Sequence, residues 1–238
     1  MIRLIAFDLD GTLTQHKTKL EADNRATLEA LSGRYKLLMV GAGACQRIFD
    51  QLGGFPIDIL GNYGMEYAEY DPTVRRIEIK ERNVVPCDRD SVDRRVTALR
   101  EKYGFTDFAG ENVQYHASGC VTFPILGTAA DLGDKLAFDP DRSKRRRIYA
   151  EVCETFPEYH VFVGGSSSFD MSPKPFNKYH ALKNYCKAHG YEESEVAFVG
   201  DDYGQGGNDE SVYLSPIRFV KIDDYRTFPQ VIREAGLL

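Results

Sequence analysis

The chain has 238 residues, of which 42% are hydrophobic, and its 30 basic and 36 acidic side chains give a formal charge of −6. This length allows one large domain or two small ones, and the composition is that of a globular protein. The acidic balance disfavours a nucleic-acid partner, and no apolar stretch is long enough to cross a membrane. The apolar stretch at residues 1–7 is too short for a signal peptide, so we expect a cytoplasmic protein. Because the five cysteines form no CxxC pair, we expect reduced thiols.

Short apolar runs that end in Gly/Asp loops dominate the first part of the chain. Residues 3–7 and 35–40 are each predicted to be buried strands of a parallel sheet. After the second run, Ile48 and Leu52 lie one helical turn apart, and Gly53 can end that helix. The pattern predicts alternating strands and helices.

The middle of the chain, from about residue 83 to 172, has a different pattern. Residues 113–116 and 168–171 alternate apolar and polar side chains, as half-exposed antiparallel strands do. One predicted helix has the apolar stripe Val92, Val96, Leu99 and Tyr103. A second is expected to start at Asp139-Pro140 and to bury Ile148, Val152 and Phe156. We therefore predict an inserted α+β domain.

The last part returns to the first pattern. Leu182, Tyr185 and Cys186 have helical spacing before Gly190, and residues 196–199 form another buried strand. In an open parallel sheet, ligands bind outside the carboxyl ends of the strands. The loops after the three apolar strands are therefore expected to converge on one site.

The strongest motif is the string Phe-Asp-Leu-Asp-Gly-Thr-Leu-Thr at residues 7–14. Two carboxylates at a strand end, Asp8 and Asp10, can place one on a metal and a phosphorus atom while the other reaches the leaving oxygen. An isolated Asp-x-Asp is more often a polar turn, but the complete string favours the chemical interpretation.

A second acidic loop spans residues 200–209, where three aspartates and one asparagine lie among glycines. Such oxygen ligands suit Mg²⁺. The alternative is a solvated, flexible loop, and the first acidic strand end favours the metal site over it.

Together these motifs resemble the haloacid dehalogenase (HAD) superfamily of aspartate-nucleophile phosphotransferases, in its phosphomannomutase-like branch with a large α+β cap (type C2B, subfamily IIB). The matching segments are residues 8–14, 40–41, 48, 51–53, 164–165, 168–170, 177–178, 200–201 and 206–209. The resemblance implies an α/β fold. Its Rossmann-like parallel-sheet core would comprise residues 1–82 and 173–238, and its cap, which sets substrate specificity, residues 83–172.

The resemblance also implies roles for the acidic residues. Asp8 would be the nucleophile, and Asp10 would act as acid and then as base while its backbone carbonyl binds the metal. Asp8 and Asp201 would supply side-chain ligands to Mg²⁺, with Asp202 and Asp209 as nearby candidates.

Other roles follow from the same likeness. Lys178 would neutralise the phosphate and the nucleophile, although a lone lysine there could also be a solvated helix residue. The expected substrate-binding residues are Gly41, Gly43, Ser168, Asp170 and Asn208.

The chain departs from the family pattern in the loop after the second strand. Residues 41–45 read Gly-Ala-Gly-Ala-Cys and lack the usual Ser or Thr hydroxyl, so backbone N–H groups at the helix start would bind the phosphate. Gly43→Ser is expected to raise kcat/KM about tenfold unless another group, with Cys45 the obvious candidate, already fills the place.

The cap departs further. Phosphomannomutases hold a second phosphate with cap arginines, yet residues 109–127 contain none, and His116 takes one such place. The basic run at residues 144–147 is predicted to be a solvated helix flank, with a phosphate clamp as the alternative.

We therefore expect a Mg²⁺-dependent phosphatase that hydrolyses a small phosphorylated metabolite, with a sugar phosphate as the expected class, through an aspartyl-phosphate. A phosphomannomutase-type mutase is the alternative within enzymes, and a non-catalytic phosphosugar-binding module is the alternative outside them.

Overall fold

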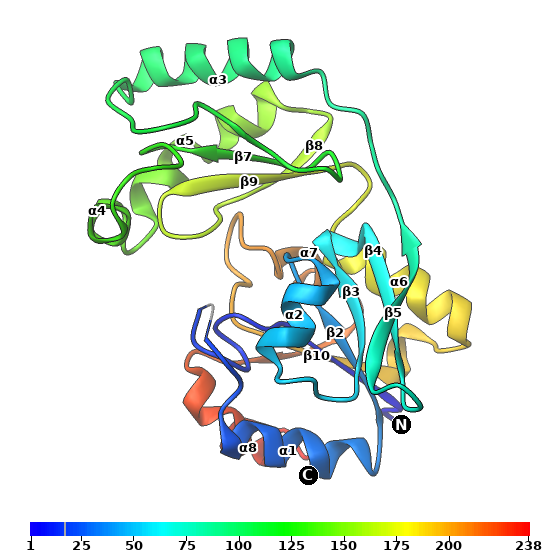
Figure 1. Ribbon diagram of the computed structural model, residues 1–238. Helices are drawn as coiled ribbons and strands as arrows, with labels where there is room; N and C mark the ends of the chain where they lie inside the picture. Colours follow the sequence, from blue (N-terminus) through cyan, green and yellow to red (C-terminus); the bar gives the residue numbers. More distant parts are fainter. Residues whose placement is uncertain (17) are drawn as a thin grey trace. The chain divides into compact units, whose positions relative to one another are not determined.

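The computed structural model describes residues 1–16 and 18–238 and separates the chain into two compact units (Figure 1). The core unit comprises Met1–Asn83, Asn177–Gly204 and Asp209–Leu238, and the cap unit comprises Val84–Phe176 with Gln205–Asn208. The sequence placed the boundaries after residues 82 and 172. The roles assigned to the two parts stay predictions.

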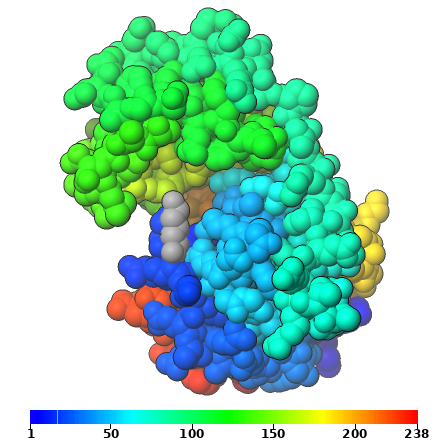
Figure 2. All heavy atoms as spheres, in the orientation of Figure 1, coloured from blue at the N-terminus to red at the C-terminus, as the bar shows by residue number. Residues whose placement is uncertain are grey.

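The core unit is built on a seven-stranded sheet in the order β11-β10-β1-β2-β3-β4-β5. Its strands are β1 (Leu4–Phe7), β2 (Lys36–Val40), β3 (Asp58–Gly61), β4 (Glu66–Asp71), β5 (Arg76–Arg82), β10 (Val196–Gly200) and β11 (Arg218–Lys221). The first five in that order are mutually parallel, while β4 and β5 add an antiparallel hairpin. The predicted α/β class with a parallel core is confirmed, and β5 lies at the surface (Figure 2).

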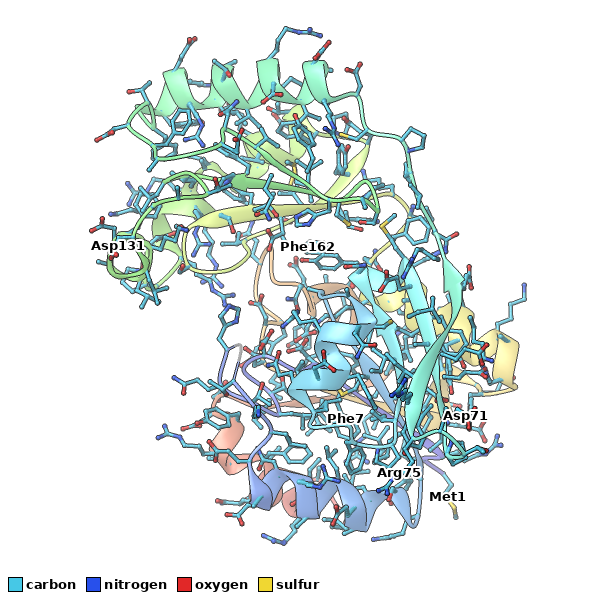
Figure 3. The ribbon with its side chains drawn as sticks, viewed as in Figure 1. Met1, Phe7, Asp71, Arg75, Asp131 and Phe162 are labelled. Carbon is cyan, nitrogen blue, oxygen red and sulfur yellow. The ribbon has the colours of Figure 1, made fainter. Side chains whose placement is uncertain are left out.

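Helices cover both faces of this sheet, because alternate residues of a strand point to opposite sides. Ile5 and Phe7 of β1 pack with α1 (Ala22–Ser32), α2 (Cys45–Gln51) and α8 (Phe228–Glu234); Phe7 is labelled in Figure 3. Leu4 and Ala6 pack with α6 (Lys178–His189) and α7 (Glu210–Tyr213). The central strands, buried on both faces, therefore read as continuous apolar runs.

The cap unit has a four-stranded antiparallel sheet in the order β6-β7-β9-β8. Its elements are β6 (Gln114–Tyr115), β7 (Val121–Pro124), β8 (Tyr159–Phe162), β9 (Ser168–Pro173), α3 (Arg89–Tyr103), α4 (Leu132–Phe138) and α5 (Ser143–Thr155). Helices α3 and α5 share an apolar core with one face of the sheet. Phe162, labelled in Figure 3, ends β8.

One predicted helix start in the cap is wrong. Helix α5 begins at Ser143 rather than at Asp139-Pro140. The side chain of Asp139 instead accepts hydrogen bonds from the backbone N–H groups of Lys144 and Arg145, at 2.9 and 3.1 Å. The carboxylate thus satisfies first-turn donors from outside the helix.

The five cysteines are free thiols. Within residues 1–16 and 18–238, no helix is both long and apolar enough to cross a membrane.

Candidate active site

Asp8 and Asp201 follow neighbouring parallel strands, so the fold places them at the same edge of the core sheet. Asp8 extends the pairing of β1 with β10, because its N–H donates to the carbonyl of Val199 at 2.9 Å. Thr12 then ties the two strand ends together by donating from Oγ1 to Oδ1 of Asp201 at 3.0 Å. The convergence expected from the strand pattern is present.

A glycine makes this close approach possible. Gly11 has a φ of +100°, and a Cβ atom there would lie 2.4 Å from Oδ2 of Asp201. Any side chain would therefore be strained in its backbone and would collide with the carboxylate.

Lys178 lies between two buried carboxylates. Its Nζ donates to Oδ1 of Asp8 at 2.5 Å and to Oδ1 of Asp209 at 2.6 Å, and the lysine side chain is fully buried. The side chain of Asn177 caps α6 by accepting from the N–H of His180, so the lysine is held in the first turn. The alternative of a solvated lysine at position 178 does not fit this geometry, whereas the position beside Asp8 is the one that the resemblance implied.

Burial and ion pairing shift the pKa values of Asp8 and Lys178 in opposite directions. Burial raises the pKa of Asp8 well above its usual value, although Lys178 lowers it. Burial would lower the pKa of Lys178, but Asp209 and Asp8 outweigh burial and raise it. The ammonium is therefore held charged beside the predicted nucleophile.

Carboxylate oxygens of Asp8, Asp201 and Asp209 lie within 4.8 Å of one another. Burial first, and then Asp209, raise the pKa of Asp201 to about 6. The three carboxylates repel one another, and only one ammonium group, that of Lys178, offsets their charge. Their oxygen atoms are therefore suitable ligands for a hard divalent cation such as Mg²⁺. Asp209, a secondary candidate in the sequence, belongs to this trio, whereas the side chains of Asp10 and Asp202 do not.

Asp10 belongs to a separate hydrogen-bonded group. Its Oδ1 accepts from Nε2 of Gln51 at 2.7 Å, and its Oδ2 accepts from Nη1 of Arg47 at 3.4 Å. Gln51 also donates to Oγ1 of Thr14 at 2.9 Å. These contacts give the Asp10 carboxyl a fixed orientation, as a proton-transfer group requires.

The loop that contains Gly41 and Gly43 differs from the sequence expectation. The N–H of Cys45 donates to Oε2 of Glu66 at 3.0 Å, so a carboxylate already occupies this donor at the start of α2. Burial, followed by Glu66, raises the pKa of the Cys45 thiol to about 12. The group that lies over Gly43 is the guanidinium of Arg47, not Cys45.

Comparison with known proteins agrees with these motifs. A family model described as eukaryotic phosphomannomutase matches residues 124–222. The phosphomannomutase of Saccharomyces cerevisiae is 23% identical over 224 residues, covering 89% of this chain and 85% of the relative. Phosphomannomutase 1 of Mus musculus is 24% identical over 235 residues, covering 90% and 84%.

Solved structures share the fold. An IMP-nucleotidase from Plasmodium falciparum with bound IMP matches all of this chain and 68% of its own at a TM-score of 0.74 and 11% identity. A HAD-superfamily phosphatase from Bacteroides thetaiotaomicron matches all of this chain and 96% of its own at 0.63 and 16%. Together these similarities support a phosphomannomutase-like protein of the haloacid dehalogenase superfamily.

The similarities support a phosphoryl-transfer enzyme, as the sequence predicted, over the non-catalytic binding module. The names of the relatives favour the mutase alternative over the phosphatase that the sequence analysis placed first. HAD enzymes generally use Mg²⁺, and the trio of Asp8, Asp201 and Asp209 fits it.

The remaining predicted residues belong to the cap unit. On β9, Oγ of Ser168 donates to the carbonyl of Gly164 at 3.1 Å, and Asp170 accepts from Oγ1 of Thr122 at 2.9 Å. Thr122 also contacts His116, at 3.1 Å from its Nε2. Asn208 lies in the segment Gln205–Asn208. Ser168, Asp170 and Asn208 stay predicted substrate-binding residues.

The basic run of the cap is not uniformly solvated. Lys144, Arg146 and Arg147 are exposed, but Arg145 is 1% exposed. Its Nε donates to Asp139 at 2.8 Å and its Nη1 to the carbonyl of Gly164 at 2.6 Å. A buried guanidinium with these partners is a structural ion pair, which excludes Arg145 from a phosphate clamp.

Sequence reasoning missed three contributors to the site: Arg47, the donor role of Gln51, and Glu66. The spacing of Arg47 and Gln51, one turn apart on a helix that follows a strand, was the available indication. Glu66 lies on the unpredicted hairpin, so no local pattern could connect it with Cys45.

Proposed function

We propose that this enzyme transfers a phosphoryl group between positions of a small phosphosugar, as a mutase, through an aspartyl-phosphate at Asp8. The observation that carries the phosphoryl-transfer step is the buried Asp8 carboxylate at the end of β1, which is paired with Lys178 and lies beside Asp201 and Asp209. The similarity to phosphomannomutases favours a mutase over a phosphatase. Such an arrangement positions a nucleophile and balances its charge.

The chain's residues account for both half-reactions. A carboxylate oxygen of Asp8 attacks phosphorus, the bond to the sugar oxygen breaks, and Asp10 gives its proton to that oxygen. In the second half-reaction a sugar hydroxyl attacks the phosphorus, Asp10 takes the hydroxyl proton, and the Asp8 carboxylate is released. Lys178 offsets negative charge at Asp8 throughout.

Asp8, Asp201 and Asp209 would hold Mg²⁺, together with the predicted contribution of the Asp10 backbone carbonyl. A bound Mg²⁺ screens the repulsion between the anionic phosphate and the anionic nucleophile.

Hydrolysis is the second candidate, and the cap supports it. None of the strands β6–β9 contains an arginine. Arg145 forms an ion pair with Asp139. Arg100 donates to the carbonyls of Pro124 and Ile125, each at 2.6 Å. Neither guanidinium is therefore available to bind a second phosphate. A mutase must hold the second phosphate of a sugar bisphosphate, for which bidentate arginines are the usual groups.

The test supplies a hexose 1-phosphate, a catalytic amount of hexose 1,6-bisphosphate and Mg²⁺, and follows hexose 6-phosphate and inorganic phosphate together. The mutase proposal predicts that 6-phosphate forms faster than phosphate. Faster phosphate release would establish the hydrolase instead. Asp8→Asn should abolish both, and activity within tenfold of wild type would exclude Asp8 as the nucleophile.

A further inference from the structure

The side chain of Arg47 lies directly over the backbone of Gly43. A Cβ atom at Gly43 would be 2.1 Å from Nη2 of Arg47 and 2.4 Å from its Nε. Any residue with a side chain at position 43 would therefore displace the guanidinium. Because only the far end of a flexible side chain has to move, the displacement need not disturb the fold.

The guanidinium of Arg47 has N–H groups that can still donate hydrogen bonds to a ligand. Nη1 of Arg47 donates to Oε1 of Gln51 at 2.8 Å and to Oδ2 of Asp10 at 3.4 Å. Among residues 1–16 and 18–238, Nε and Nη2 have no recorded hydrogen-bond acceptor, and the side chain is 41% exposed. Arginine presents its donors in a planar fork that matches the oxygens of a phosphate.

The carboxylates at the ends of β1 and β10 and a bound phosphate would together carry more negative charge than Lys178 and a divalent cation can balance. Lys178 is already shared by Asp8 and Asp209, and Asp201 is buried nearby. A bound divalent cation would balance the carboxylates but not the two negative charges of an incoming phosphate ester. Arg47 contacts Asp10, the group expected at the leaving oxygen, and so lies beside the position of the transferring group.

We propose that Arg47 binds the phosphoryl group during transfer and takes the place of the hydroxyl that the loop at residues 41–45 lacks. The inference rests on the proposed function and adds a substrate-binding residue to it. Gly43 is then a glycine because the guanidinium occupies the space above it. The proposal reverses the sequence expectation for Gly43→Ser: the variant should lower kcat/KM, because the new side chain displaces Arg47.

The experiment measures the dissociation constant of inorganic phosphate with Mg²⁺ present, and kcat/KM for p-nitrophenyl phosphate and for an alkyl phosphate. The variants are Arg47→Met, Arg47→Lys, Gly43→Ser and the double variant Gly43→Ser/Arg47→Met. Arg25→Met is the matched control, since Arg25 is a partly exposed arginine of the same unit whose side chain is 40% exposed and pairs with Glu29.

Arg47→Met should weaken phosphate binding about 10- to 100-fold, the range for losing charge-assisted hydrogen bonds, and lower kcat/KM for both esters. Arg47→Lys should fall in between, and Arg25→Met should match wild type. Because both changes affect one place, the double variant should be no worse than Arg47→Met alone.

Phosphate affinity of Arg47→Met within twofold of wild type overturns the inference; a loss of rate confined to the alkyl ester would then show that Arg47 only positions Asp10. Strictly additive effects of Gly43→Ser and Arg47→Met also overturn it. A wild-type protein that turns over no ester but binds phosphate through Arg47 would refute the proposed function and support this inference. Normal turnover with Arg47-independent binding would do the reverse.

Discussion

Replacing Lys178 with methionine tests the charge balance on which the site depends. Methionine keeps much of the side-chain length but removes the ammonium, so Asp8 and Asp209 face each other as buried carboxylates without their shared partner. Removing one partner of a buried ion pair costs about 3–5 kcal/mol. We expect the free energy of unfolding to fall by that amount at pH 7 in the presence of a metal chelator.

The assay is urea unfolding followed by circular dichroism, combined with turnover of p-nitrophenyl phosphate. A second variant, Lys178→Met with Asp209→Asn, removes one of the two orphaned charges. It should therefore recover about 1–3 kcal/mol relative to Lys178→Met alone, the usual coupling energy for residues in direct contact. Turnover should remain abolished in both, because neither variant restores the cation beside Asp8.

A loss below about 1 kcal/mol, a size usual for exposed ion pairs, would refute the reasoning. So would a double variant that is less stable than Lys178→Met, since that result would mean that Asp209 contributes independently of the lysine.

Two further predictions concern other carboxylates. Asp10→Asn should lower the rate for an alkyl phosphate about 10²- to 10⁴-fold and affect p-nitrophenyl phosphate much less, because only the poor leaving group needs a proton; equal losses would contradict its role as the acid. In the cap, burial raises the pKa of Asp139, but hydrogen bonds from Arg145 and backbone amides outweigh burial and lower it. Its stabilisation is therefore present above pH ~4 and lost as the pH falls through the lowered pKa. Urea unfolding of Asp139→Asn against pH should lack this acid-dependent loss, and identical profiles below pH 4 would contradict it.

The strands that position the site could be predicted because each is buried on both faces and ends in a polar loop. The apolar runs before Asp8 and Asp201 correspond to β1 and β10, and the stripes of α3 and α5 were equally readable. In contrast, α4 is only seven residues long and buries none of them, and its apolar pair one turn apart, Leu132 and Leu136, is exposed, so no buried stripe marks this helix.

Contacts between residues far apart in the chain, and ion pairs such as that of Arg145 with Asp139, could not be predicted from the sequence patterns. Arg145 looked like one member of a solvated basic run, yet it lies one helical turn before the buried Ile148 and is neutralised by Asp139. Burial of a charge depends on whether a partner is present in space, and hydrophobic periodicity does not report that.

Helix α2 connects two parts of the site that the sequence treated separately. Arg47 and Gln51 lie one turn apart, hydrogen-bond to each other, and both hydrogen-bond to Asp10. Gln51 also reaches Thr14, so this helix holds the loop after β1 at two points. A phosphate bound by Arg47 would pull on the same side chains that orient Asp10. Substrate binding and the alignment of the proton donor are therefore coupled through a single turn of helix.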